Sequence, residues 1–260
     1  MADKHTKEFY IGYLPKAPQG LGKAMRNVII LLMVAAAGIA VLLSASQQSF
    51  YPSVFEFGNY RDFEGIIKEK PYPMLLVQRP GQAGILPGYS QYYLVTFGKF
   101  GAQDAVKGLD GKRVKLQGSL VYRDNQTMIE IADNTFEALE DAPSALNNFT
   151  WNGAGERLGV FQLTGEIVDS KCYLGVMNPG NLKPHKSCAI RCLSGGIPPV
   201  LVVKDREGLA TYFLLVSQDG KTVNREVLPM VADPVQITGE VIQFENLLVL
   251  RADPRSYRRL

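Results

Sequence analysis

The stretches VKLQGSLV (residues 114–121) and VQITGEVI (residues 235–242) share one pattern, in which apolar and polar residues alternate around a central glycine. Alternation with a period of two residues indicates a β-strand with one buried face. Each stretch is followed by a polar turn and a last apolar run that ends in Ala-Asp, at residues 132–133 and 252–253. The chain therefore contains the same unit twice.

The correspondence extends upstream of these two stretches. FEGII (63–67) corresponds to LTGEI (163–167), and YYLV (92–95) corresponds to YFLL (212–215). Between the third and fourth strands each copy has a short stretch that we predict to be helical, residues 102–108 and 224–231. The predicted strands are residues 63–67, 74–77, 92–97, 114–122 and 128–131 in the first copy, and 163–168, 200–204, 212–216, 235–242 and 247–250 in the second.

The element order β-β-β-α-β-β is that of an OB-fold, and glycine in the first and fourth strands suits the sharp bends of a small closed barrel. We therefore predict a mainly β protein with two tandem OB-like barrels, at residues 49–140 and 158–256. The alternative is one larger β-sandwich that uses all the strands. A sandwich would not require the repeat, so the repeat favours two barrels.

An apolar run precedes both barrels. Residues 28–43 contain only apolar residues and glycine, and the next charged residue after this run is Glu56. About 20 such residues span the hydrocarbon core of a membrane as a helix, which predicts a single-pass transmembrane helix at residues 28–46. A cleaved signal peptide is the competing interpretation, because small residues at 44–46 could form a cleavage site.

The charge distribution supports a membrane protein. The chain has 28 Lys and Arg against 25 Asp and Glu, a net charge of +3, and residues 1–27 hold five of the basic and two of the acidic residues. Residues 28–260 are therefore neutral. By the positive-inside rule, we expect residues 1–27 to form a cytoplasmic tail and the rest of the chain to be exported.

Composition excludes several classes of protein. The net charge is too small for a nucleic-acid binder that neutralises phosphates, so we expect no nucleic-acid partner. Three cysteines in 260 residues are too few for a disulfide scaffold. A hydrophobic content of 46% excludes general disorder.

All three cysteines lie in the second copy, with the one histidine that we expect to be exported. Cys172 follows a predicted strand, and a proline before His185 and the glycines at 195–196 predict the start and the end of a short helix. On that helix His185, Cys188 and Cys192 are spaced i, i+3, i+7 and share a face. Cys172 can fold back on them across a loop.

Three thiols and an imidazole suit a soft or borderline metal ion. Cys3His is a common structural zinc set, and thiolate-rich sites also bind copper(I). We therefore predict Cys172, His185, Cys188 and Cys192 as ligands of zinc or copper, with Met177 as a further soft ligand. An iron–sulfur cluster is less favoured outside the cytoplasm. Asp169 either orients a ligand or caps a turn.

Two other interpretations of the cysteines stay open. In an oxidising compartment a 172–192 or 172–188 disulfide would pin the loop to the helix and leave one free thiol. Alternatively, Cys188 or Cys192 could act in a thiol oxidoreductase. No Ser-His-Asp set, phosphate-binding loop or haem motif occurs. The sequence therefore leaves the catalytic residues unknown and predicts no cofactor-binding residue, and a non-enzymatic role is favoured.

The motif Asp169-x-x-Cys172-Tyr173, followed by HxxCAxxC at residues 185–192 and Gly-x-x-Pro at residues 195–198, resembles that of an uncharacterised family of bacterial membrane-anchored and periplasmic proteins. The resemblance covers roughly residues 160–253. It implies an exported OB-like domain in a bacterial envelope, with the predicted helix in the bacterial inner membrane, residues 1–27 in the cytoplasm and the barrels in the periplasm, and it implies no particular activity.

Together these features predict a membrane-anchored periplasmic accessory or binding protein with a metal or redox centre. We expect it to dock on another envelope protein, and the aromatic residues Tyr92, Tyr93 and Phe97 are candidates for that contact. The alternatives are a structural subunit of a membrane complex, with the cysteines as a disulfide staple, and a thiol oxidoreductase. The sequence predicts no substrate.

Overall fold

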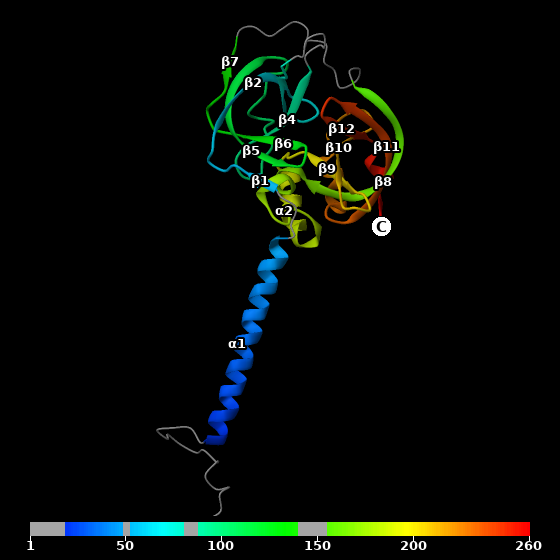
Figure 1. Cartoon of the computed structure of the whole chain (residues 1–260). Coiled ribbons are helices and arrows are strands. Elements are labelled where there is room, and N and C mark those ends of the chain that lie inside the picture. Colours follow the sequence, from blue (N-terminus) through cyan, green and yellow to red (C-terminus); the bar gives the residue numbers. More distant parts are fainter. Residues whose placement is uncertain (1–18, 49–52, 81–87, 140–154) are drawn as a thin grey trace, which may run out of the picture. The chain divides into compact units, whose positions relative to one another are not determined.

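A computed structural model describes residues 19–48, 53–80, 88–139 and 155–260. The chain divides into two compact units, residues 1–51 and residues 52–260. Helix α1 (Gln19–Gln48) belongs to the first unit, and all strands belong to the second (Figure 1).

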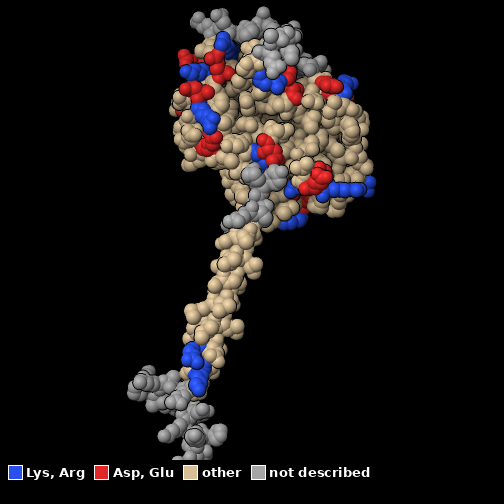
Figure 2. Space-filling model, in the orientation of Figure 1, with Lys and Arg blue, Asp and Glu red and all other residues tan. Residues whose placement is uncertain are grey.

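Helix α1 confirms the predicted N-terminal apolar helix and is longer than predicted. Its 30 residues extend about 45 Å at about 1.5 Å per residue. Residues Gly20–Ser46 are long and apolar enough to cross a membrane. Figure 2 shows the helix without charged side chains except near its N-terminal end, where Lys23 and Arg26 lie. A helix that is apolar on all sides requires apolar surroundings.

The first barrel is closed by five strands. Strands β2, β3 and β4 pair antiparallel in sequence order, β4 pairs parallel with β6, and β5 pairs antiparallel with both β2 and β6. The short strands β1 (Ser53–Phe55) and β7 (Glu137–Ala138) add to β5. The barrel strands are β2 (Arg61–Lys68), β3 (Met74–Gln78), β4 (Tyr89–Val95), β5 (Arg113–Arg123) and β6 (Gln126–Ile131).

The second barrel repeats this pairing. Strands β8, β9 and β10 pair antiparallel in order, β10 is parallel to β12, and β11 closes the barrel against β8 and β12. The strands are β8 (Glu156–Asp169), β9 (Pro199–Lys204), β10 (Ala210–Val216), β11 (Pro234–Phe244) and β12 (Leu247–Arg251), and β13 (Arg258–Arg259) adds to β11. Two OB-like barrels are confirmed, and a single sandwich is excluded.

The repeated glycines have a steric cause. A Cβ atom at Gly118 of β5 would lie 2.6 Å from the carbonyl oxygen of Glu130, and one at Gly239 of β11 would lie 2.6 Å from that of Arg251. Real Cβ atoms do not approach backbone so closely. The strongly bent fourth strand of each barrel therefore needs glycine where it crosses the fifth.

The helical insertions differ between the copies. The prediction of a helix at residues 102–108 is wrong, because these residues form turns. They include one helix-like hydrogen bond, in which the Val106 amide donates to the Ala102 carbonyl. The second copy has α3 (Asn224–Val227) and a 3₁₀ turn (Leu228–Met230) at the corresponding place. It also inserts the π-helical turn η2 (Cys172–Val176) and helix α2 (Leu182–Ser194) between β8 and β9. Residues 140–154, which include most of the segment between the two predicted barrels, lie outside the described residues.

The two barrels pack on each other through a shared apolar core. Tyr72, Tyr93 and Met128 of the first barrel and Cys172 and Cys192 of the second belong to one buried cluster. Each barrel also has a smaller core of its own. The cysteine-bearing insertion of the second barrel thus lies where the barrels meet.

Candidate metal centre

Helix α2 carries three of the four predicted ligands, as expected. Its first turn includes Pro184, and the amide of Gly195 caps the last carbonyls. His185 and Cys192 are buried, with 3% and 1% exposure, whereas Cys188 is half-buried. The i, i+3, i+7 spacing therefore places all three on the face turned toward the protein, with Cys188 at its edge.

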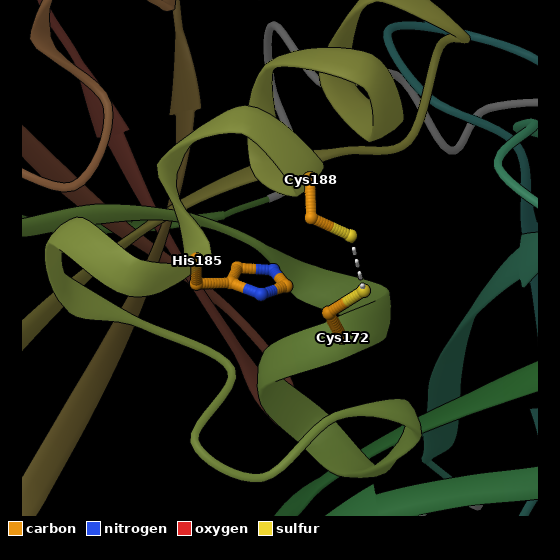
Figure 3. A group of neighbouring side chains, drawn as sticks. All are labelled: Cys172, His185 and Cys188. Carbon is orange, nitrogen blue, oxygen red and sulfur yellow. Dashed lines mark hydrogen bonds between the residues drawn. The ribbon is translucent and has the colours of Figure 1, made fainter.

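Cys172 faces this helix from η2. Strand β8 ends at Asp169, whose Oδ1 accepts the backbone N–H of Cys172 at 2.8 Å. The Sγ atom of Cys172 lies 3.8 Å from Sγ of Cys188 and 3.9 Å from Sγ of Cys192. Figure 3 shows the His185 ring and the sulfur atoms of Cys172 and Cys188 turned toward one another.

Asp169 also holds the histidine. Its Oδ2 lies 2.8 Å from Nε2 of His185, and both side chains are buried. The other ring nitrogen, Nδ1, is buried without a hydrogen-bond partner among the described residues. With the proton on Nε2, His185 donates to Asp169 and keeps a free lone pair on Nδ1. Asp169 thus both caps the turn and orients the imidazole, the two roles that its position suggested.

The structure brings the four predicted ligands together in two overlapping groups. One ligand atom each from Cys172, His185 and Cys188 lie within 4.8 Å of one another, and so do those of Asp169, Cys172 and Cys192. Cys172 belongs to both groups and is the centre of the cluster. Met177 is 43% exposed, unlike the buried Cys172, so the structure does not support it as a further ligand.

The three cysteines are free thiols. The sulfur atoms of a disulfide are about 2.05 Å apart. Cys172 therefore forms no disulfide with Cys188 or Cys192, whose Sγ atoms lie 3.8 and 3.9 Å from its own. Tetrahedral zinc bound at about 2.3 Å separates neighbouring thiolates by about 3.8 Å. The contact with Cys192, together with burial, raises the pKa of Cys172, and the same contact lowers the pKa of Cys192.

Lys99 of the first barrel completes the cluster. Its Nζ donates to Sγ of Cys188 at 2.7 Å, and this contact raises the pKa of Lys99. Sequence reasoning missed Lys99, which lies in the segment Phe97-Gly-Lys-Phe-Gly101. That segment reads as an ordinary turn and gave no signal for a site 89 residues away in sequence.

The loop that carries Lys99 is held by residues next to the cysteines. Buried Lys171 pairs with Glu130 and donates to the carbonyls of Thr96 and Gly98 at 2.8 and 2.7 Å. The amide of Gly101 donates to the carbonyl of Gly195 at 2.9 Å. Hydrogen bonds therefore attach this loop of the first barrel to the second barrel at Lys171, next to Cys172, and at Gly195, three residues after Cys192.

The predicted aromatic docking residues are only partly exposed. Tyr93 is 3% exposed and belongs to the shared core, so its prediction as a contact residue is wrong. Alternation along β4 turns Tyr93 inward, and the second barrel covers the face that the sequence left open. Phe97 is 66% exposed and Phe100 62%, on either side of Lys99.

Comparisons with known proteins identify no family for this chain. Searches with protein-family models find no match, and searches of curated protein sequences find no significant match. Among solved structures, the chain is similar to a deletion mutant of the single-stranded DNA-binding protein from Thermus aquaticus, with 14% identity over 80% of this chain and 87% of that chain. The TM-score of 0.23 is too low for this similarity to bear on fold or function.

Proposed function

We propose that this protein is a membrane-anchored accessory protein of the bacterial envelope that binds one metal ion through Cys172, His185, Cys188 and Cys192. The main support is the buried Nδ1 of His185, which has no hydrogen-bond partner among the residues that the structure describes. Buried polar atoms without a partner are rare in proteins, and a bound metal ion would satisfy this one.

The surroundings of His185 support a ligand role. Histidines that bind metals usually donate their second N–H to a carboxylate, which fixes the tautomer and the ring. Asp169 is placed for this at 2.8 Å from Nε2. The same carboxylate accepts the Cys172 amide, so one residue orients two of the proposed ligands.

The donor set favours zinc or copper(I). Thiolates are soft ligands and imidazole suits both metals. Three thiolates would leave excess negative charge on either ion, and the ammonium group of Lys99 at 2.7 Å from Cys188 would offset part of it. Cys192 belongs to a different group from Cys188 and His185. For all four residues to bind one ion, Cys192 would have to move toward Cys188 and His185.

The membrane location extends the same proposal. Helix α1 is long and apolar enough to span a bilayer, and five basic residues precede residue 28. We propose an uncleaved anchor with the barrels in the periplasm, attached to another envelope protein. N-terminal sequencing of the membrane-bound protein tests this, since a cleaved signal peptide would yield a chain that begins after residue 46.

Metal analysis of the full chain, purified in detergent under reducing conditions, tests the centre. We expect about one equivalent of zinc or copper, and cobalt(II) substitution should produce a thiolate charge-transfer band. Cys172→Ser should abolish binding, whereas His5→Ala, in the N-terminal tail, should leave it unchanged. Wild-type protein that binds no metal with all three thiols reduced would overturn the proposal.

The remaining candidates predict different results. A structural subunit with a disulfide staple, purified without reductant, would show one free thiol and no metal, and the membrane helix would serve for packing. A thiol oxidoreductase would lose function in Cys188→Ser without loss of stability. The contact between Lys99 and Cys188 is the observation that favours thiol chemistry.

A further inference from the structure

The three cysteines differ in their access to solvent. Cys172 is 4% exposed and Cys192 1%, whereas Cys188 is half-buried at the edge of the cluster. A reagent from outside can therefore reach Cys188 before the other two. Cys188 also has a cationic partner, because Lys99 Nζ lies 2.7 Å from its Sγ, and a neighbouring cation stabilises the reactive thiolate.

Cys172 lies ready to react with an oxidised Cys188. Its Sγ is 3.8 Å from that of Cys188, so the two sulfur atoms must approach by about 1.8 Å to reach the bond length of about 2.05 Å. Its distance to Cys192 is similar, 3.9 Å, but both of those thiols are buried. Exposure, rather than distance, therefore distinguishes the two possible pairs.

We propose that the centre is controlled by thiol–disulfide exchange, with Cys188 as the entry thiol, Cys172 as the resolving thiol and Cys192 as the thiol that stays reduced. Exchange removes two of the proposed ligands and so releases the metal ion, and this release rests on the proposed metal-binding function. The external reactant is an organic disulfide, which an oxidising periplasm can supply.

The exchange balances in two steps. The Cys188 thiolate attacks one sulfur of the external disulfide, the external S–S bond breaks, and one external thiolate leaves. The Cys172 thiol then gives up its proton as it attacks Sγ of Cys188, the bond between Cys188 and the external group breaks, a bond forms between the two cysteines, and the second external thiolate leaves with that proton. The two cysteine sulfurs lose two electrons to the external disulfide, and an external dithiol reverses the reaction.

Lys99 acts in this exchange as a positioning residue. Its ammonium group stabilises the attacking thiolate from the opposite barrel, held there by Lys171 and Gly195. Lys99→Met should slow the first step about tenfold, whereas Lys99→Arg should keep most of the rate because the charge remains. Lys107→Met is the matched control, because Lys107 is an exposed lysine in the same connection between β4 and β5 as Lys99.

Glutathione disulfide added to the reduced full chain in detergent tests the proposal. Samples are quenched by alkylation and mapped by peptide mass spectrometry, with and without zinc. We expect a Cys172–Cys188 disulfide in the wild type and in Cys192→Ser, and a glutathione adduct trapped on Cys188 in Cys172→Ser. A first product that joins Cys172 to Cys192, or no exchange at Cys188, would overturn the proposal.

Zinc release, followed in parallel with a chromophoric chelator, separates the two proposals. Release should have the same rate as disulfide formation. If the wild type binds no metal yet forms the Cys172–Cys188 bond, the metal-binding proposal fails and the exchange order stands. If the protein binds zinc but keeps it while Cys188 stays reduced, the exchange proposal fails alone.

Discussion

At the scale of single residues, Asp169 is the side chain on which the geometry of the centre depends. One of its oxygens accepts the Cys172 amide and the other contacts His185. Without a carboxylate at this position, the imidazole loses the partner that fixes its tautomer and the turn that presents Cys172 loses its cap.

We predict that Asp169→Asn lowers metal affinity about 10- to 100-fold, the usual effect of removing a carboxylate behind a histidine ligand. Competition with a chromophoric chelator measures this. Asp205→Asn is a matched control, because Asp205 also caps a turn, through the amides of Glu207 and Leu209, and belongs to neither group of candidate ligands. Equal affinity in the wild type and Asp169→Asn would remove His185 from the ligand set.

A second prediction at this scale concerns the glycine of the repeated strand. Gly239→Ala places a methyl group 2.6 Å from the Arg251 carbonyl oxygen and 2.8 Å from Ala252 Cβ. We expect the free energy of unfolding to fall by about 2–4 kcal/mol, because a packed crossing cannot make room without moving backbone. Thermal denaturation of the detergent-solubilised chain measures the loss.

Gly208→Ala is the useful comparison for that glycine. Gly208 has a positive φ of 88° but open space around it, so only the backbone cost of about 1 kcal/mol is expected. A larger loss at Gly208 than at Gly239 would contradict the steric account of the barrel glycines.

At the scale of elements, ion pairs with one buried carboxylate, that of Asp233, attach helix α2 to the second barrel. Buried Asp233, just before β11, pairs with Lys183 and with Lys186 of α2, the latter at 2.9 Å, and with Arg259 of β13 at 3.1 Å. Hydrogen bonds from Lys183 and Lys186 lower the pKa of Asp233 to about 2. The helix that carries the ligands is thereby tied to the second barrel.

We predict that Asp233→Asn lowers the free energy of unfolding at pH 7 by about 1–3 kcal/mol, the range for hydrogen bonds to charged groups. The folded pKa lies below the unfolded value of about 3.9. The stabilisation is therefore complete above about pH 4 and is lost as pH falls toward 2. Unfolding of both proteins as a function of pH should show curves that converge over this window.

Asp219→Asn serves as the control for the pH experiment. Asp219 also has a pKa lowered to about 2, through Lys221 and Ser217, but this pair is exposed and screened by solvent. A smaller effect is expected there. Parallel curves for the wild type and Asp233→Asn down to pH 2 would show that the carboxylate contributes nothing through its charge.

At the scale of the whole molecule, the first barrel is part of the centre. It contributes Lys99, which contacts Cys188. Its β4–β5 loop is held in place by hydrogen bonds with Lys171 and Gly195. A cluster built on one copy of the repeat is thus completed by the other copy.

We predict that Lys171→Met destabilises the protein by about 3–5 kcal/mol, because it leaves the carboxylate of Glu130 buried without its cation. Alkylation of Cys188 should also become slower, because the loop loosens and Lys99 no longer stays beside the Cys188 thiolate. The double variant with Glu130→Gln should recover part of the stability but not the wild-type alkylation rate. Full recovery of both would mean that Lys171 does not position the loop.

Much of the second barrel could be predicted because its signals are local. Alternation, glycine at the strand crossings and a proline-to-glycine helix are properties of short segments, and α2 begins and ends close to the predicted residues. The prediction failed at residues 102–108, where a single turn carries too few backbone bonds for a helix. It failed at Tyr93 because the second barrel covers that face.

The sequence by itself determined the apolar helix, the repeated five-strand units and the gathering of three cysteines beside one histidine, since each is a pattern of near neighbours along the chain. Only the tertiary structure decided that Lys99 contacts Cys188, that Lys171 pairs with Glu130 and that Asp169 holds His185. The contacts with Lys99 and Glu130 depend on how two closed barrels pack. That packing follows from complementary apolar surfaces and leaves no short-range pattern in the residues that it brings together.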